Sequence, residues 1–130
     1  EEIVVVFNFR SDIMYPINSN VQLLSALKKR NFKLYYLSNF PLDVFEEIKS
    51  DYYFFRYFDG GIISSEVKLS KPDLRFYRLL LEKYALLPDE SLFIDDLEIN
   101  VKAAETVGMK GFATFGNHNI GSDILKMLNT

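Results

Sequence analysis

Short apolar runs alternate with longer amphipathic segments along this chain. The run at residues 34–37 is continuous in its hydrophobicity rather than alternating with polar residues, and shorter strand-like runs follow at residues 62–63, 92–94 and 112–115. Continuous apolar strands are typical of parallel sheets that helices cover on both faces. Between these runs, apolar residues at helical spacing predict helices that begin near residues 20, 41, 72, 100 and 120. Strands that alternate with helices in this way predict an α/β fold with a parallel sheet.

Local signals refine the boundaries of these elements. Ser19 or Asn20 is expected to cap the first of these helices, and the helix after Pro41 to bury Leu42, Phe45 and Ile48. Gly60-Gly61 is expected to break the chain before the strand at residues 62–63, and residues 64–70 to form a loop. The aromatic run at residues 52–58 is expected to pack in the core and at its rim.

The segment at residues 3–7 is ambiguous between strand and helix. Its β-branched composition favours a strand. The acidic pair Glu1-Glu2 ahead of it, with Ile3, Val6 and Phe7 on one side, also permits a helix. The chain begins without Met, and a leading Met is normally removed only before a small residue. We therefore expect that the natural protein extends upstream of Glu1.

Composition narrows the classes of function. The chain has 130 residues, which is one domain, and its 15 basic and 18 acidic residues give a net charge of −3. A domain that binds nucleic acid usually carries a basic surface, so this class is disfavoured. No apolar run approaches the roughly 20 residues that span a bilayer, so we expect no membrane partner. Cysteine is absent, which excludes disulfides and a cysteine nucleophile and fits a reducing, cytoplasmic compartment.

Three polar groups fall at or beyond the ends of predicted strands. Ser38-Asn39 closes the strand at residues 34–37, Lys71 ends the loop after residues 62–63, and Asp95-Asp96 closes the strand at residues 92–94. Ligands of open α/β sheets bind outside the carboxyl ends of the strands, so we expect these groups to converge. A hydroxyl and an ammonium group suit phosphate oxygens, and adjacent carboxylates suit Mg²⁺. Together they are the parts of a phosphoryl-transfer site.

Each of these groups also has a purely structural interpretation. Ser38-Asn39 can be a helix cap before Pro41, Lys71 a solvated surface lysine, and one of the two aspartates a helix cap. The single histidine, His118, lies in a Gly/Asn-rich segment and is interpreted as a loop residue.

The strings KLYYLSNFP, DGGIISSEVKLSKPD and SLFIDDLEINVKAAETVGMKG, in this order, resemble the haloacid dehalogenase (HAD) superfamily of hydrolases. The similarity is to its dehalogenase-like subfamily, which includes sugar-phosphate phosphatases. The resemblance implies a Rossmann-like three-layer parallel sheet, Mg²⁺ as cofactor and an aspartyl-phosphate intermediate. It implies phosphate binding by Ser38, Asn39 and Lys71, with Lys71 also neutralising the nucleophile. It implies metal binding by Asp96 and Asp95, with Asn100 supporting the metal shell.

The sequence departs from this family in its first motif. The family has Asp-x-Asp after its first strand, as nucleophile and general acid/base, and no Asp-x-Asp occurs in these 130 residues. One explanation is that residues 1–17 are the tail of a helical cap, that residues 18–130 are the core and that the first strand lies upstream. The other is that residues 4–10 are a decayed first motif, with Asn8 in the place of the nucleophile and Arg10 in that of the acid/base.

These alternatives define the expected function. By lineage the chain is a Mg²⁺-dependent hydrolase of a small phosphomonoester whose nucleophile is absent from the chain, and by itself it is expected to be inactive. The alternative is a non-catalytic module that binds phosphate, metal or a protein. If the first strand is missing, we expect a gap in the sheet, leading to aggregation, dimerisation or recruitment of the N-terminal segment. A phosphoacceptor receiver domain has a different motif order, and no G-x-G-x-x-G indicates a dinucleotide enzyme.

Overall fold

The structure is a computed structural model that describes residues 4–7, 18–51, 53–114 and 121–128. Five strands alternate with helices within these residues. The strands are β1 (Val4–Phe7), β2 (Lys33–Ser38), β3 (Gly60–Ile63), β4 (Ser91–Asp95) and β5 (Lys110–Ala113). The helices are α1 (Asn18–Lys29), α2 (Leu42–Asp51), α3 (Ser64–Val67), α4 (Leu74–Lys83), α5 (Glu98–Thr106) and α6 (Gly121–Leu128). Short 3₁₀ turns, η1 (Tyr53–Tyr57) and η2 (Pro88–Glu90), precede β3 and β4.

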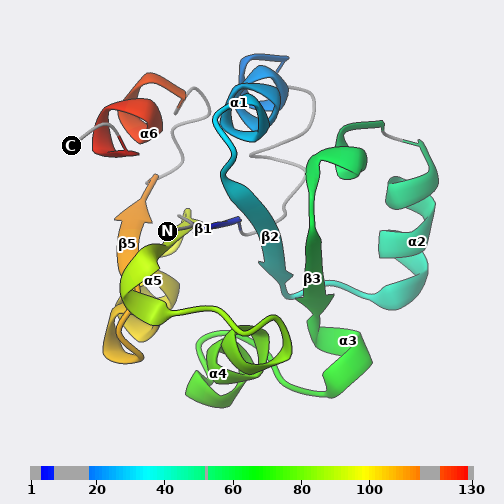
Figure 1. Ribbon diagram of the computed structural model, residues 1–130. Helices are drawn as coiled ribbons and strands as arrows, with labels where there is room; N and C mark the ends of the chain where they lie inside the picture. Colours follow the sequence, from blue (N-terminus) through cyan, green and yellow to red (C-terminus); the bar gives the residue numbers. More distant parts are fainter. Residues whose placement is uncertain (1–3, 8–17, 52, 115–120, 129–130) are drawn as a thin grey trace.

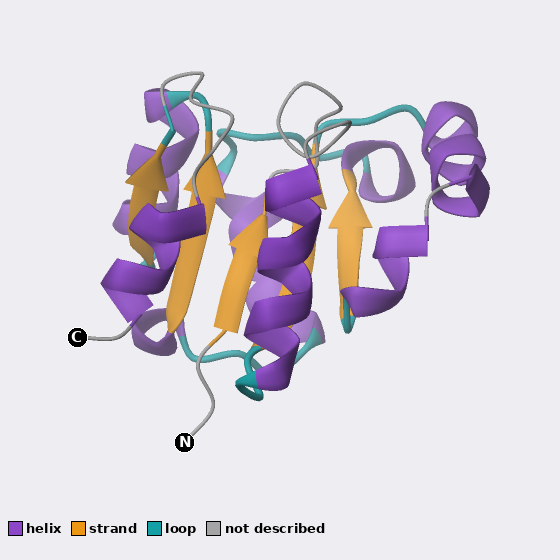
Figure 2. Ribbon diagram, turned by 90° about the horizontal axis from the view of Figure 1, so that it is seen from above, coloured by secondary structure: helices purple, strands orange, loops and turns teal. Residues whose placement is uncertain are grey.

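The strands form one parallel sheet in the order β3-β2-β1-β4-β5. All its arrows point the same way in Figure 2. Strand β1 lies in the centre, where Val4 is in register with Lys33 of β2 and with Ser91 of β4. All four β1 residues are buried, as a strand covered on both faces requires. The fold is therefore the predicted Rossmann-like α/β arrangement.

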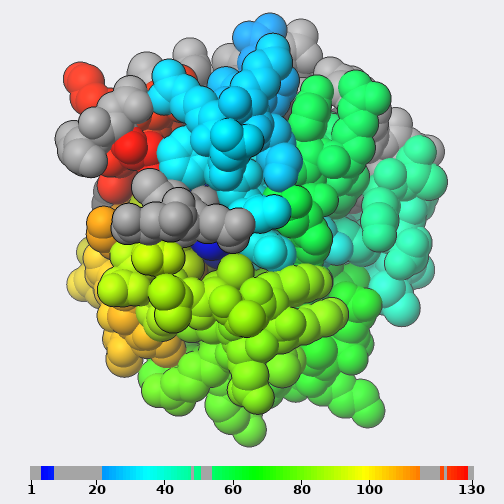
Figure 3. Space-filling model, viewed as in Figure 1, coloured from blue at the N-terminus to red at the C-terminus, as the bar shows by residue number. Residues whose placement is uncertain are grey.

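Two hydrophobic layers cover the sheet on opposite faces, and Figure 1 shows α1 and α6 on one side of it and α4 and α5 on the other. The first layer joins Val5 and Phe7 to the apolar residues of α1 and to the aromatic side chains of α2 and η1. The second joins Val4 and Val6 to α4 and α5. Side chains of β1 alternate between the two layers, because successive residues of a strand point to opposite faces. In Figure 3 the atoms of α1 lie at the top of this face and those around α4 and α5 at the bottom.

The structure decides the ambiguity at the N-terminal segment. Val4–Phe7 is a strand, so the helical alternative for these residues is wrong. The sheet has no gap between β2 and β4, because β1 pairs with both of them. The arrangement matches both a first strand with an altered motif and an N-terminal segment recruited into that strand's place. Asn8 and Arg10 lie outside the described residues.

Several boundary predictions were wrong for identifiable reasons. Gly60 and Gly61 belong to β3 rather than breaking the chain before it. They lie under two aromatic rings, and a Cβ at either position would overlap Tyr84 or Tyr36. The segment expected as a loop contains the short helix α3, and α1 begins at Asn18, before both of its expected caps.

Helix α2 buries less of its predicted apolar face than its periodicity indicates. Phe45 is buried against the aromatic cluster, but Leu42 is 44% exposed, and Val44 is exposed as well. The aromatic run nearby behaves as predicted, since Phe54 and Phe55 are buried in the core. No helix in the described part of the chain is both long enough and apolar enough to cross a membrane.

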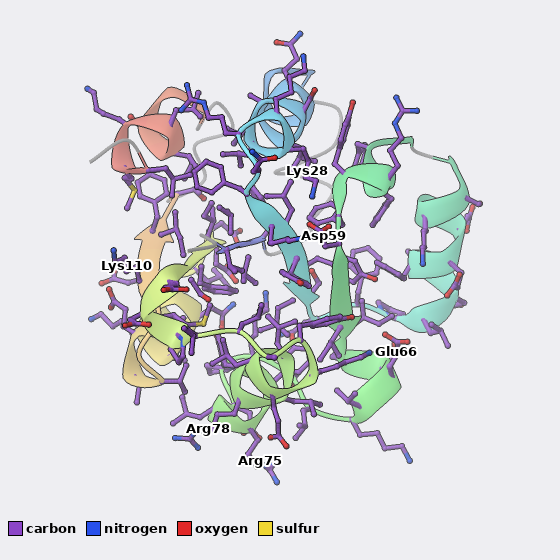
Figure 4. The ribbon with its side chains drawn as sticks, in the orientation of Figure 1. Lys28, Asp59, Glu66, Arg75, Arg78 and Lys110 are labelled. Atoms are coloured by element: carbon purple, nitrogen blue, oxygen red, sulfur yellow. The ribbon has the colours of Figure 1, made fainter. Side chains whose placement is uncertain are left out.

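An ion pair fastens the amino-terminal edge of the sheet. The Asp59 carboxylate accepts a hydrogen bond from Lys28 Nζ of α1 at 2.8 Å and one from the backbone N–H of Leu34 at 2.9 Å. Figure 4 shows the two labelled side chains close together beside β2. These contacts join the end of α1 to the starts of β2 and β3, on the edge opposite to the predicted site.

Candidate phosphate-binding site

The predicted site residues gather at the carboxyl edge of the sheet. Ser38 is the last residue of β2 and is fully buried. Asp95 is the last residue of β4 and is also fully buried, and Asp96 follows it at a partly exposed position. Strand β1 lies between β2 and β4, so all three strands end side by side. Lys71 reaches this edge from the loop between α3 and α4.

The centre of the site is a buried ion pair between Lys71 and Asp95. Lys71 Nζ lies 2.9 Å from Asp95 Oδ2, and the two side chains are 1% and 0% exposed. Asp95 Oδ2 also accepts from Asn100 Nδ2 at 3.1 Å, and Asp95 Oδ1 accepts from the Leu97 N–H at 2.9 Å. Both carboxylate oxygens are therefore engaged within the protein. A buried carboxylate needs such partners, because an unpaired charge in this environment is very costly.

Asn39 fixes the backbone of Lys71. Its Oδ1 accepts a hydrogen bond from the Lys71 N–H at 2.8 Å, and its Nδ2 donates to the Lys71 carbonyl at 3.2 Å. The side-chain amide thus pairs with both polar groups of one residue, as a neighbouring strand would. The resemblance implies phosphate contact through the Asn39 backbone, and these contacts show in addition that its side chain positions Lys71.

A second group of contacts, from α4 and β4, supports Asn100 and Lys71. The Tyr77 hydroxyl of α4 donates to the Asn100 carbonyl at 2.7 Å. Burial, together with the charge of Asp95, raises the pKa of Tyr77, so the phenol remains a neutral donor. The Tyr77 ring packs edge-to-face on Phe93, and Lys71 Nζ lies 5.5 Å from the centre of the Phe93 ring. The cation therefore rests on an aromatic surface, which adds a favourable interaction.

The loop after β2 and the end of β5 complete this edge. The Phe40 N–H donates to Ser64 Oγ at 3.0 Å, which ties the loop after Ser38 to the start of α3. The Thr114 N–H donates to the Asp95 carbonyl at 2.9 Å. The buried Thr114 hydroxyl has no hydrogen-bond partner among the described residues.

The donor set fits Mg²⁺ only in company with a phosphate group. No cluster of three or more His, Cys, Asp or Glu side chains suited to a metal occurs within the described ranges. Asp95 pairs with Lys71 and accepts a hydrogen bond from Asn100, and Asp96, the next residue, adds a partly exposed carboxylate at this edge. Mg²⁺ commonly takes one or two carboxylates together with water and phosphate oxygens. Asp96 would therefore hold the ion, and the ion would neutralise charge on the phosphate.

The structure thus brings Ser38, Lys71, Asp95 and Asp96 to one edge, as the strand-end rule predicts. The other two predicted residues, Asn39 and Asn100, lie there as well and bind Lys71 and Asp95. His118 lies outside the described residues. The sequence did not predict that Tyr77 supports the site, because a tyrosine on the apolar stripe of a helix is normally interpreted as a core residue. The only signal for it was a hydroxyl on an otherwise apolar face.

Comparison with known proteins assigns the family. Residues 5–108 match the model of the haloacid dehalogenase-like hydrolase family. The chain belongs to this family. The match begins within β1, so this strand lies inside the part of the chain that resembles other HAD hydrolases.

Curated relatives are HAD-containing enzymes of several kinds. The sesquiterpene phosphatase astK of Aspergillus oryzae is 33% identical over 110 residues, which are 85% of this chain and 56% of that protein. The phosphorylated carbohydrates phosphatase of Thermotoga maritima is 33% identical over 55 residues, 42% of this chain and 26% of that protein. This chain therefore spans about half, or less, of the length of these relatives.

Solved structures show the same fold. The HAD family enzyme bt-2542 of Bacteroides thetaiotaomicron, in complex with magnesium and inorganic phosphate, has a TM-score of 0.68 at 27% identity. That match covers 75% of this chain and 52% of the other. The core domain of a Streptococcus pneumoniae protein described as a phosphoglycolate phosphatase has a TM-score of 0.77 at 20% identity. It covers 100% of this chain and 97% of that domain.

Proposed function

We propose that this chain is a HAD-type module that binds a phosphomonoester and Mg²⁺ without hydrolysing the ester. By lineage it is a phosphatase, and the family acts on small phosphorylated substrates. The observation that carries the proposal is the pairing of an intact, buried Lys71–Asp95 centre with a sequence that contains no Asp-x-Asp. The binding parts of the site are present, and the reacting carboxylate is not.

In the sequence, Asn8 and Arg10 take the places that the two aspartates have in the first motif of other family members. Asn8 follows β1 directly in the sequence, and β1 is the central strand that ends beside β2 and β4. A carboxamide cannot form an acyl-phosphate, because its oxygen is a poor nucleophile. Arg10, two residues on, stays charged at any accessible pH and cannot shuttle a proton. Neither chemical step of the family is then available.

Charge balance explains how the remaining groups would hold the ester. Lys71 is already neutralised by Asp95, so it can offer a phosphate only part of its positive field. Asn8 adds no negative charge to the site, in contrast to an aspartate. The phosphate dianion therefore meets less repulsion than it would beside an ionised nucleophile, and Mg²⁺ held by Asp96 would compensate the rest. Ser38 is proposed to contact the phosphoryl oxygens at the end of β2.

A solved structure that this chain resembles holds magnesium and phosphate although one of its aspartates has been replaced. A variant of bt-2542 in which an aspartate is replaced by alanine has also been solved in complex with magnesium and inorganic phosphate. That variant resembles this chain with 27% sequence identity and a TM-score of 0.68. Loss of one aspartate in that protein is therefore compatible with occupancy of its site.

The test restores the missing motif. The unmodified chain is expected to bind inorganic phosphate in the presence of Mg²⁺, measured by calorimetry, and to show no turnover of para-nitrophenyl phosphate. The double variant Asn8→Asp/Arg10→Asp is expected to gain Mg²⁺-dependent turnover, and Asn8→Ser/Arg10→Ser is its matched control. Turnover by the unmodified chain that Asp96→Ala abolishes would overturn the proposal. So would failure of the unmodified chain to bind phosphate with Mg²⁺.

A further inference from the structure

We propose that the ester bound here is the monophosphate of an apolar alcohol, whose hydrocarbon part lies against Leu97 and Ile99 beside the phosphate. This inference rests on the proposed function, because it extends the same site outward. The names of the relatives leave the organic part open, since they include both a terpenoid and a carbohydrate phosphatase. The exposed side chains around the site favour the apolar class.

Two exposed apolar residues follow the acidic pair directly. Leu97 is 47% exposed and Ile99 is 62% exposed, although both are large hydrophobic side chains. The Leu97 N–H is bound to Asp95 Oδ1, so the backbone at Leu97 is fixed one turn from the buried ion pair. The apolar surface is thus held at the mouth of the site by the same carboxylate that holds Lys71.

The other side of the site is also apolar. Phe40 follows Ser38-Asn39 and is partly buried, and Leu42, at the start of α2, is 44% exposed. These residues continue from β2, while Leu97 and Ile99 continue from β4, and only β1 separates the two strands. Strands lie about 4.8 Å apart, so the two segments leave the sheet roughly 10 Å from one another. Apolar side chains therefore follow the carboxyl ends of both strands that flank β1.

Three polar side chains beside Leu97 and Ile99 or beside Lys71 are engaged within the protein. Asn39 uses its amide on the Lys71 backbone, and Asn100 donates to Asp95. Glu98, between the two apolar residues, is exposed and pairs with Lys102 at 3.3 Å. A sugar hydroxyl that reached these three side chains would have to replace contacts that they already make, which costs affinity. A hydrocarbon would instead gain from covering Leu97 and Ile99.

The linker between β1 and α1 is short. Only ten residues, 8–17, connect β1 to α1, which is too few for an inserted folded domain. An apolar ligand can therefore approach the mouth of the site without displacing a domain inserted at that point.

The experiment compares three probes by calorimetry with Mg²⁺ present: inorganic phosphate, glucose 6-phosphate and geranyl monophosphate below its aggregation concentration. Geranyl monophosphate is expected to bind about tenfold or more tightly than glucose 6-phosphate, as burial of one or two apolar side chains allows. The variant Leu97→Ser/Ile99→Ser is expected to lose this advantage and to keep its affinity for inorganic phosphate. Leu87→Ser is the matched control, because Leu87 is 57% exposed but precedes β4 at the opposite edge.

The outcomes separate the two proposals. If inorganic phosphate does not bind, the proposed function fails. If it binds but the two esters bind equally, or if the advantage survives in Leu97→Ser/Ile99→Ser, this inference is wrong while the proposed function stands. Sedimentation at several concentrations checks whether a second copy covers the surface. A dimer that the double serine variant abolishes and Leu87→Ser retains would assign Leu97 and Ile99 to that interface and overturn the inference.

Discussion

Two lysine–aspartate pairs lie at opposite edges of the same sheet. Lys71 and Asp95 are 2.9 Å apart at the carboxyl edge, and Lys28 and Asp59 are 2.8 Å apart at the amino edge. The distances are nearly equal, but the first pair is 1% and 0% exposed and the second 31% and 26%. Burial is therefore what distinguishes them. Water can stabilise either member of the outer pair alone, whereas each member of the inner pair depends on its partner.

The difference extends to the groups around each pair. The buried pair is surrounded by further fixed donors, namely the Asn100 amide, the Leu97 N–H and the amide of Asn39 on the Lys71 backbone. The outer pair has the Leu34 N–H as an additional donor to Asp59. A costly, fully partnered pair at a ligand-binding edge is consistent with a functional site, because hydrophobic residues would hold the fold at lower cost.

The largest effect is expected from breaking the buried pair. Asp95→Asn removes the carboxylate that lies 2.9 Å from the buried Lys71 ammonium group, so we expect the free energy of unfolding to fall by about 3–5 kcal/mol. Urea denaturation measures this loss. The double variant Lys71→Met/Asp95→Asn removes both charges and is expected to recover most of the stability. A double variant no more stable than Asp95→Asn would contradict the claim that an unpaired buried charge is the cause.

An intermediate effect is expected from the support of Lys71. Asn39→Ala removes two hydrogen bonds to the Lys71 backbone and leaves buried groups unpaired, so we expect a loss of about 1–2 kcal/mol. Phosphate affinity is expected to fall as well, because the position of the ammonium group is no longer fixed. Asn39→Asp keeps the acceptor for the Lys71 N–H and serves as the control, with a smaller loss expected. Equal stability and affinity in Asn39→Ala and the unmodified chain would show that Asn39 does not position Lys71.

The smallest effect is expected at the outer pair. Burial alone would raise the pKa of Asp59, but hydrogen bonds from Lys28 and the Leu34 N–H outweigh it and hold this pKa below its usual value. A lowered folded-state pKa contributes stability above the ordinary carboxyl pKa near ~4, and this contribution is lost as pH falls through the folded value. Asp59→Asn is therefore expected to cost about 1 kcal/mol at neutral pH.

Denaturation of the unmodified chain and of Asp59→Asn between pH 7 and pH 3 checks the direction of this pH dependence. The stability gap between the unmodified chain and Asp59→Asn is expected to narrow below about pH 4. A gap that widens on acidification, or a loss at neutral pH as large as that of Asp95→Asn, would remove the contrast between the two pairs.

Much of the architecture could be predicted from periodicity, and particular side chains show where prediction stopped. The continuous apolar runs predicted β2 and β4 within one residue at each end, because parallel strands buried on both faces have few alternatives. Leu42 was predicted to be buried from helical spacing, yet it is exposed, because spacing does not say whether a neighbour covers a face. Gly60 and Gly61 were predicted to break the chain before the strand, yet they belong to it. The reason is that the rings of Tyr84 and Tyr36 leave no room for a Cβ there, and both rings come from parts of the chain that are remote in sequence.

The sequence by itself determined the family, the order of its motifs and the absence of Asp-x-Asp, because these are properties of residue identity and spacing. It also placed Ser38, Lys71 and Asp95-Asp96 at one edge, since parallel strands end on the same side of a sheet. Only the tertiary structure decided that Val4–Phe7 is the central strand, because strand and helix both satisfied its local pattern. It also decided that the Asp95 carboxylate pairs with Lys71 and that the Asn39 side chain binds the backbone of Lys71. Those partners are set by packing between elements 24 and 32 residues apart in the chain, which local sequence does not specify.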